Sequence, residues 1–387
     1  MSSTNYEFAT QLIHAAQEPD LQTGAVNVPI HLSSTFAQKS PGQPGPFEYS
    51  RSDNPTRQVL QKNLAVLEKG SHAFCFSSGC AATTAVIMML KSGDHVVCGS
   101  DLYGGTHRLF GQIFSRLGIT TTPCDLYDAN NLAPAIQKNT RMIWLETPSN
   151  PMLKLADIEA ISKVANDHKL ILVVDNTFAS PYLQNPLTLG AHVVVHSTTK
   201  YIGGHSDILG GAAITNDESL AEQIGFLQNA CGGVPSPFEC YLALRSLKTL
   251  HVRMQRHCEN ATQIADLLSS HPKIKRVIFP GHKSFTQNEL YKKQMRGPGG
   301  MISLEITGTA HNAAKFLENL SVFTCAESLG GVESLAESPF LMTHQKVDDR
   351  LKKILGISPE LIRLSVGIED IKDLKNDILH ALEQSFS

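Results

Sequence analysis

The chain has 387 residues, of which 42% are hydrophobic and 18% charged, so it can bury a sizeable core and exceeds the usual length of one domain. Its formal net charge of -3, with no block of like charges, argues against a nucleic-acid or membrane-surface partner and favours a small soluble ligand. No signal-peptide pattern is visible, and no apolar run approaches about 18 residues, so we expect a cytoplasmic protein. The eight cysteines form no C-x-x-C pair, which is typical of reduced thiols in a cytosolic protein.

The first 55 residues are rich in proline, glycine and serine and show no clear hydrophobic period, so we predict an extended N-terminal arm. A helical pattern begins at Thr56 and is followed by short apolar strands that alternate with amphipathic helices. Near-continuous apolar strands of this kind predict a mostly parallel central sheet, covered by helices on both faces. The predicted strands are residues 72–76, 95–99, 141–146, 170–175 and 191–196.

The pattern changes after Ser236. It predicts a long helix over roughly 238–270 and then strands around 275–279, 300–306 and 361–366, with helices between them. These elements make an α+β tail of the size of a domain. We therefore expect three parts: the arm (1–55), an α/β domain (56–250) and a smaller C-terminal α+β domain (251–387).

Polar residues collect where the predicted strands end, which is where ligands bind in an open parallel α/β sheet. After the first strand, Ser77, Ser78 and Gly79 lead directly into a helix, and a helix N-terminus opened by glycine and serine can hold a phosphate. An ordinary strand-to-helix turn is the simpler interpretation of that segment by itself. The second and third strands are followed by Tyr103, beside two glycines, and by Asn150, just before a proline.

The fourth and fifth strands add an acid and an amine. Asp175 ends an apolar run and must be paired if it is buried, although a helix N-cap would explain it equally well. Lys200 follows a strand and a cluster of hydroxyl residues that includes Ser197 and Thr199, a setting that a surface lysine does not need. Desolvation lowers the pKa of a lysine in a pocket floor, and the neutral amine can attack an aldehyde.

One cofactor requires all of these groups at once. Pyridoxal 5′-phosphate needs an amine for its aldehyde, an acid for its ring nitrogen, an aromatic ring to stack on and donors for its phosphate. The set of residues at the strand ends therefore predicts this cofactor.

Eight segments along the chain strengthen this hypothesis: YSRSDNPTR (49–57), SSGCAA (77–82), DLYGGT (101–106), ETPSNP (146–151), VVDNTF (173–178), HSTTKYIGGHSD (196–207), AESLGGVESL (326–335) and IRLSVGIED (362–370). In their residues and in their order along the chain, these segments resemble those of the pyridoxal phosphate-dependent transsulfuration enzymes of cysteine and methionine metabolism. The resemblance spans nearly the whole chain. It implies the aminotransferase-like α/β fold (fold type I), with a smaller α+β C-terminal domain. It also implies a homotetramer built from two dimers, with active sites shared between subunits.

The resemblance assigns roles position by position. Its catalytic set is Lys200, Asp175 and Tyr103: the Schiff-base lysine that also moves protons, the acid on the pyridinium nitrogen, and the ring stacked on the cofactor. The implied phosphate ligands are the main-chain N–H groups of Gly79 and Cys80, the side chains of Ser197 and Thr199 and, from the neighbouring subunit, Tyr49 and Arg51. The implied substrate contacts are Arg363 with its helpers Asn150 and the Ser328 main chain at the carboxylate, and Arg108, Glu48 and Glu333 at the distal end. A solvated salt bridge is the alternative for Arg108 and Glu333.

Two positions depart from the family pattern. Cys80 stands where methionine is common, and it is expected to contribute only its main-chain N–H group. Asp53 stands where glycine is commoner, so it changes the local turn geometry and adds negative charge near a phosphate-binding segment.

The resemblance implies elimination or replacement at the γ-carbon of an amino acid. We expect cystathionine γ-lyase activity, which yields cysteine, 2-oxobutanoate and ammonia, because Glu48 and Glu333 suit the ammonium at the far end of cystathionine. The alternatives, in order, are cystathionine γ-synthase, which joins an O-acyl-homoserine to cysteine, then cystathionine β-lyase and methionine γ-lyase. Gly105, where methionine γ-lyases carry cysteine, argues against methionine as the main substrate.

Other protein classes fit less well. Ser197-x-x-Lys200 and Ser52-Asp53-Asn54 are similar to motifs of penicillin-recognising enzymes, but their order is reversed and no Lys-Thr-Gly follows. The sixteen histidines include no H-E-x-x-H, so no metal site is expected. A binding protein that kept only the fold would have lost Lys200, Asp175 or Arg363, and all three are present.

Overall fold

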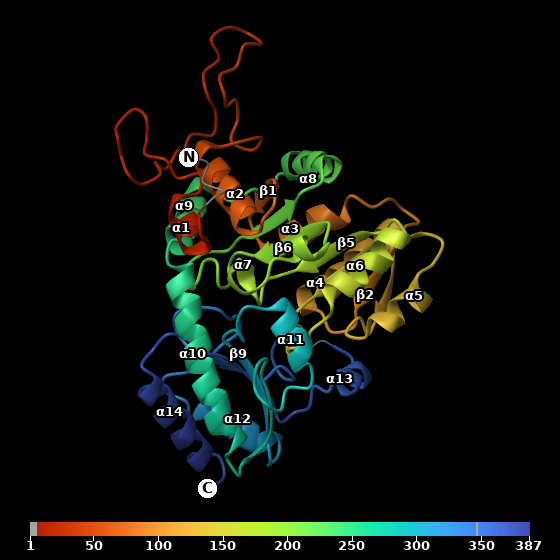
Figure 1. Cartoon of the computed structure of the whole chain (residues 1–387), viewed down its shortest axis with the longest axis vertical. Coiled ribbons are helices and arrows are strands. Elements are labelled where there is room, and N and C mark those ends of the chain that lie inside the picture. Colours follow the sequence, from red (N-terminus) through yellow and green to blue (C-terminus); the bar gives the residue numbers. More distant parts are fainter. Residues whose placement is uncertain (1–5, 346) are drawn as a thin grey trace.

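The computed structural model describes residues 6–345 and 347–387, which form two β-sheets with helices packed around them (Figure 1). The larger sheet has seven strands in the order β1-β7-β6-β5-β4-β2-β3. Strand β7 runs antiparallel to both of its neighbours, and the other six strands share one direction. Its strands are β1 (His72–Phe76), β2 (His95–Gly99), β3 (Thr120–Cys124), β4 (Thr140–Glu146), β5 (Ile171–Asp175), β6 (Val193–Ser197) and β7 (Gly211–Thr215). The expected mostly parallel sheet is confirmed.

The five strands predicted in this half are all present, whereas β3 and β7 were not predicted. Strand β3 lies at the edge of the sheet and contains three threonines and Pro123, which an edge strand tolerates because one side of its backbone forms no ladder. Strand β7 consists of Gly211, two alanines, Ile214 and Thr215, and it is fully buried between β1 and β6. Neither strand has the long apolar run that identified the others.

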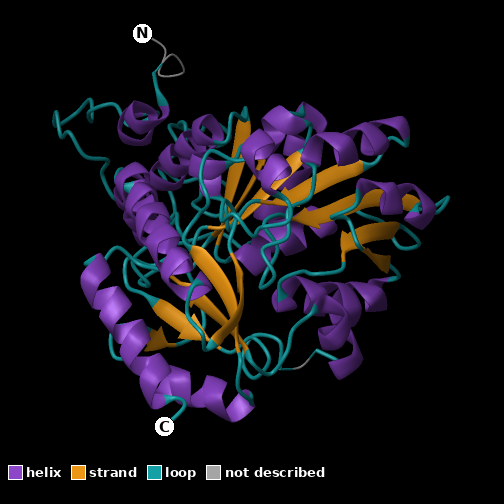
Figure 2. Ribbon diagram, turned by 60° about the horizontal axis from the view of Figure 1, so that its bottom comes forward, coloured by secondary structure: helices purple, strands orange, loops and turns teal. Residues whose placement is uncertain are grey.

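Helices cover both faces of the larger sheet, as the apolar strands predicted (Figure 2). On one face, Val173, Val193 and Val195 share a buried cluster with residues of α3 and α8. On the other face, Val174 packs with α6, and Val194 belongs to a cluster that includes residues of α2. The helices of this half are α2 (Pro55–Leu67), α3 (Gly79–Ile87), α4 (Gly104–Arg108), α5 (Leu132–Ala135), α6 (Ile158–Asp167), α7 (Ser180–Leu183) and α8 (Glu218–Cys231).

The smaller sheet has five strands in the order β10-β11-β12-β9-β8, and helices α10, α12 and α14 bury its apolar face. Its strands are β8 (Ile274–Ile278), β9 (Met301–Ile306), β10 (Thr324–Cys325), β11 (Leu335–Glu337) and β12 (Leu361–Ser365). The helices are α9 (Pro237–Leu247), α10 (Leu250–Ser269), α11 (Asn288–Gln294), α12 (Ala310–Glu318), α13 (Asp349–Leu355) and α14 (Ile371–Gln384). Three of the strands were predicted, and the very short β10 and β11 were not.

The single long helix predicted over 238–270 is wrong, because the chain breaks it into α9 and α10. Thr249 lies in the break and its hydroxyl bonds to the Ser246 carbonyl. The same carbonyl accepts a bond from Arg253, which also donates to the Tyr201 carbonyl at 2.7 Å. Through these bonds, Arg253 links the junction of α9 and α10 to the turn that follows Lys200.

The N-terminal arm extends away from the sheets as two long loops (Figure 1). It contains one helix that the sequence did not predict, α1 (Phe8–His14), which is held to α2 by a bond from the Asn63 side chain to the Ala15 carbonyl. Beyond α1 the arm exposes large apolar side chains, and Leu21 is fully exposed. The described arm thus carries an apolar surface that the chain itself does not cover.

Within the residues that the structure describes, no helix is both long and apolar enough to cross a membrane.

Candidate active site

A cavity of about 340 Å³ lies at the carboxyl ends of the parallel strands, where the sequence placed its candidate residues. Both sheets contribute to it, because Arg363 comes from β12 and Glu146 from β4. Of the predicted site residues, the cavity is lined by Gly79, Cys80, Tyr103, Asn150, Asp175, Ser197, Thr199, Lys200, Ser328 and Arg363. Folding thus brings together residues that lie far apart in the sequence.

One end of the cavity is a cradle of hydrogen-bond donors. Ser78 caps helix α3 by accepting a bond from the Ala81 N–H, while the N–H groups of Gly79 and Cys80 have no hydrogen-bond acceptor in the described part of the chain. A Cβ atom on Gly79 would lie 2.8 Å from the Ser197 Cβ, so only glycine lets the helix approach β6 this closely. Thr199 lies on the same side and accepts a bond from the Gly210 N–H at 3.0 Å. These free N–H groups and hydroxyls suit a phosphate at a helix N-terminus.

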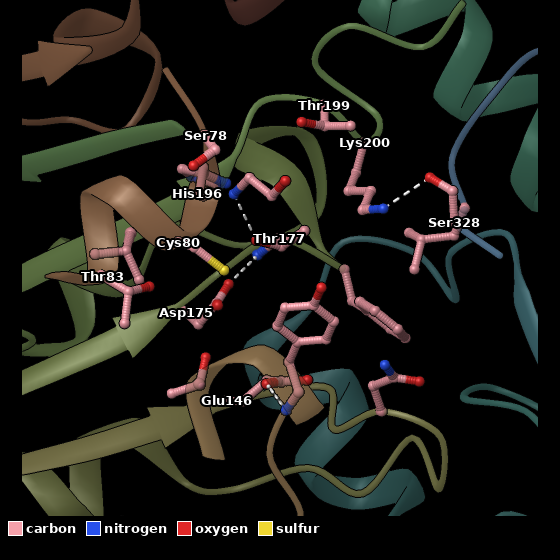
Figure 3. A pocket seen from close by; sticks show the side chains of 18 of the residues that line it. Ser78, Cys80, Thr83, Glu146, Asp175, Thr177, His196, Thr199, Lys200 and Ser328 are labelled. Carbon is pink, nitrogen blue, oxygen red and sulfur yellow. Dashed lines mark hydrogen bonds between the residues drawn. The ribbon is translucent and has the colours of Figure 1, made fainter. Parts of the chain in front are cut away.

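Two carboxyl groups lie side by side beneath this cradle. Asp175 accepts a bond from the Thr177 N–H at 3.0 Å, and Glu146 accepts one from the Tyr103 N–H at 2.8 Å (Figure 3). Burial raises the pKa of Asp175, and burial together with the charge of Asp175 raises that of Glu146. The alternative role of Asp175 as a helix N-cap is not what the structure shows, because no helix begins at Asn176. A cation placed against Asp175 would stabilise its ionised form.

Lys200 extends into the cavity from the turn after β6, and its Nζ donates to the Ser328 Oγ at 2.7 Å (Figure 3). Burial, followed by the charge of Arg363, lowers the pKa of Lys200 to about 8. An appreciable fraction of this amine is therefore neutral near neutral pH, as a nucleophile requires. Its hydrogen bond goes to Ser328 and not to Ser197, so the Ser-x-x-Lys pattern has no counterpart in the geometry.

Arg363, on β12, is 2% exposed and also lines the cavity. Its Nη1 donates to the Asn150 Oδ1 at 2.8 Å, and its Nη2 donates to the Ser328 carbonyl at 2.8 Å. Both predicted helpers of Arg363 are thus in contact with it. Sequence reasoning missed a third partner, Glu337, which lies 3.0 Å from Nη1 and is 1% exposed.

Tyr103 lines the cavity, and its ring lies close to Gly105 of α4. A Cβ atom on Gly105 would lie 2.3 Å from the Tyr103 Cε1, so a larger residue at 105 would move the ring. Burial raises the pKa of the Tyr103 hydroxyl, which keeps it protonated. Cys80 also faces the cavity, and burial raises the pKa of its thiol.

The remaining predicted residues do not line the cavity of the single chain. Arg51 stacks over the Tyr49 ring at 5.5 Å and donates to the Asn229 carbonyl, and Glu48 is exposed on the same arm. Arg108 is exposed on α4, and Glu333 accepts a bond from the Ser206 hydroxyl. Within the segment 326–335, the carboxylate that lines the cavity is not Glu333 but Glu327, directly before Ser328. The AESLGG segment contained it, and only its adjacency to Ser328 could have identified it from the sequence.

These residues fit pyridoxal phosphate. The cradle supplies donors for the phosphate, Asp175 offers a carboxylate that needs a cationic partner, and Lys200 offers a partly neutral amine in the same cavity. The described residues contain no group of three or more His, Cys, Asp or Glu side chains that could hold a metal ion.

The lowered pKa of Lys200 predicts a pH dependence of stability. The protonated amine costs stability at pH values below about 8, and this cost, roughly 3 kcal/mol, is relieved as pH rises from 8 toward the ordinary value of 10.5. We expect the Lys200→Met apoprotein to have a larger free energy of unfolding than the parent apoprotein. This difference should shrink as the pH rises from 8 toward 10.5. Urea unfolding at pH 7, 8.5 and 10 measures it, and a constant difference would contradict the burial of a charged amine.

Comparison with known proteins agrees with the geometry. The family model of the Cys/Met metabolism PLP-dependent enzymes matches residues 9–383. Cystathionine gamma-lyase of Dictyostelium discoideum is 50% identical over 381 residues, which are 98% of each chain. Cystathionine gamma-synthase of Mycobacterium tuberculosis (strain ATCC 25618 / H37Rv) is 52% identical over 376 residues, 97% of this chain and 96% of that protein. The crystal structure of metB from Corynebacterium glutamicum matches with a TM-score of 0.96 and 47% identity, covering 99% of both chains. The chain therefore belongs to the Cys/Met metabolism PLP-dependent enzymes, has their fold type I architecture and uses pyridoxal phosphate as its cofactor.

Proposed function

We propose that the enzyme cleaves L-cystathionine by γ-elimination to L-cysteine, 2-oxobutanoate and ammonia. One arrangement carries the proposal: Arg363 and Glu327 line the same cavity as Lys200. Cystathionine has a carboxylate beside its reacting carbons and an ammonium at its far end, and these charges match an arginine and a separate carboxylate. A relative named cystathionine gamma-lyase, 50% identical to this chain, supports the same activity.

In this proposal each residue has a defined task. Arg363 holds the α-carboxylate, and Asp175 stabilises a positive charge on the ring nitrogen. Pyridoxal phosphate, when bound, supplies an aldehyde that joins amines and a ring that withdraws electrons from the substrate α-carbon. Lys200 Nζ, freed by the substrate amine, would take the α-proton, give that proton up again and, as a neutral amine once more, take a β-proton, while the Ser328 hydroxyl keeps it in reach. The γ-thiolate departs with a proton as cysteine, and water releases the remainder as 2-oxobutanoate and ammonia.

The second candidate is γ-replacement, in which cysteine displaces the acyl group of an O-acyl-homoserine. It is favoured by the 52% identity with a relative named cystathionine gamma-synthase. Both reactions begin with removal of the α-proton and use the same cofactor. The difference therefore lies where the cavity meets the far end of the substrate, and in this proposal Glu327, which lines the cavity, selects a charged far end.

We also propose that the arm completes the site of a neighbouring subunit in a cytoplasmic homotetramer built from two dimers. Tyr49 and Arg51 do not line the cavity of their own chain, and the arm exposes apolar residues such as Leu21. Tyr49 and Arg51 would then reach the partner's phosphate cradle, and Glu48 its substrate.

The lysine assignment predicts a covalent product. Borohydride reduction of the yellow holoenzyme is expected to leave the mass of the cofactor on the peptide that contains Lys200, because reduction fixes the bond between amine and aldehyde. Peptide mass spectrometry measures it, and Lys200→Arg is the matched control. A colourless protein, or labelling at another lysine, would refute the assignment.

The choice of reaction is tested by parallel assays. One contains cystathionine alone, and the other contains an O-acyl-homoserine plus cysteine, with 2-oxobutanoate, cysteine and cystathionine all quantified. We expect rapid formation of 2-oxobutanoate from cystathionine alone. If only the second mixture reacts, and it yields cystathionine, the enzyme is a synthase.

The shared site predicts complementation between two inactive variants. Lys200→Ala lacks the amine and Arg51→Ala lacks the donated phosphate contact, but a mixed dimer has one site with both residues. Co-expression under two affinity tags should restore about a quarter of the parental activity per chain, because half of the randomly formed dimers are mixed. If the isolated mixed species is as inactive as each variant, Arg51 serves its own chain.

A further inference from the structure

Glu337 and Arg363 form a buried cross-strand ion pair. The two residues are direct Cα partners in the antiparallel ladder of β11 and β12, and their side chains are 1% and 2% exposed. The Glu337 Oε1 lies 3.0 Å from the Arg363 Nη1 and also accepts a bond from the Thr343 hydroxyl at 2.9 Å. The Glu337 Oε2 has no hydrogen-bond partner among the described residues.

Only some of the N–H donors of the Arg363 guanidinium have partners. Nη1 donates to Asn150 and forms an ion pair with Glu337, and Nη2 donates to the Ser328 carbonyl, while the buried Nε has no hydrogen-bond partner within the described chain. Donors thus remain for an incoming carboxylate, but the charge is already balanced by one. A substrate carboxylate would be the second anion on a single guanidinium, in a site where charges are poorly screened.

Other charged groups near this pair do not replace Glu337. Lys200 carries the same sign as Arg363, and Glu327 and Glu146 influence Arg363 without a hydrogen bond to it. His344 lies near Arg363, and burial lowers the pKa of its imidazole to about 4, so it is neutral. Glu337 is the carboxylate in direct contact with the guanidinium.

We propose that Glu337 is an internal counter-ion that positions Arg363 and weakens its hold on the substrate α-carboxylate, so that carboxylate ligands exchange readily. The inference rests on the proposed role of Arg363. The counter-ion role and a purely structural role predict opposite changes in carboxylate affinity. If Glu337 is a counter-ion, removing its charge while keeping its shape should tighten carboxylate binding. Loss of support for Arg363 alone would loosen it.

The test uses holoenzyme, Glu337→Gln and two probes: propanoate, which has the carboxylate but no amine, and the uncharged propanamide. We expect the competitive inhibition constant of propanoate to fall roughly tenfold in Glu337→Gln, because repulsion by one adjacent anion is removed. Inhibition by propanamide should not change. The KM for the amino-acid substrate should fall without a rise in kcat, because the carboxylate contact is the same before and during the reaction.

Glu305→Gln is the matched control. Glu305 is a buried carboxylate of the same sheet that pairs with Lys275 and Arg276 and does not line the cavity, so its removal should leave propanoate inhibition unchanged. Should Glu337→Gln fail to fold, Thr343→Val gives the opposite test. It deletes the bond that Thr343 donates to Glu337, which leaves more negative charge against Arg363, so propanoate inhibition should weaken about two- to threefold while propanamide inhibition stays unchanged. A displaced Arg363 would instead weaken inhibition by both probes, and that result would overturn the counter-ion proposal.

The outcomes separate the inference from the function on which it rests. If propanoate inhibits the parent and Arg363→Gln equally, Arg363 does not bind the carboxylate and the proposed site is wrong. If Arg363→Gln abolishes inhibition but Glu337→Gln leaves it unchanged or weakens it, Glu337 has only a structural role and the counter-ion proposal fails.

Discussion

The chemistry of the site depends on the burial of one amine beside a permanent positive charge. Lys200 extends into the cavity and is partly shielded from solvent there, and the Arg363 guanidinium lines the same cavity, so both desolvation and repulsion favour the neutral amine. The Ser328 hydroxyl accepts the bond of the amine and fixes its direction. A lysine in water would be almost fully protonated and would react slowly with an aldehyde.

The arrangement of the two sheets makes the burial of the Lys200 amine possible. The parallel sheet delivers Glu146, Asp175 and the turn bearing Lys200 at one edge, because parallel strands end on the same side. The smaller sheet supplies Arg363, whose buried charge is tolerated since Asn150, Ser328 and Glu337 surround it. Each buried charge in the cavity thus has a partner from a distant part of the chain, or needs one from the cofactor, as Asp175 does.

If Glu337 acts as the proposed counter-ion, the same balance of charge sets how readily Arg363 exchanges carboxylate ligands. A guanidinium without a counter-ion would hold a carboxylate tightly, and release of a carboxylate product would then be slow. A guanidinium with a built-in counter-ion can orient a carboxylate and still release it. In the proposed role of Glu337, this adjustment comes from two residues that are held opposite each other by the ladder of β11 and β12.

The sequence by itself determined the main strands of both sheets, the segment that opens α3, and the positions of Asp175 and Lys200, because these depend on local hydrophobic runs and on residues next to them in the chain. The tertiary structure alone decided that Glu337 faces Arg363, that Glu327 and not Glu333 lines the cavity, and that α9 and α10 are separate helices. The pairing of β11 with β12 decides the first of these features, and the anchoring of Arg253 to the turn after Lys200 accompanies the last. Each joins residues far apart in sequence, and the energy of a buried charge depends on which groups folding places around it.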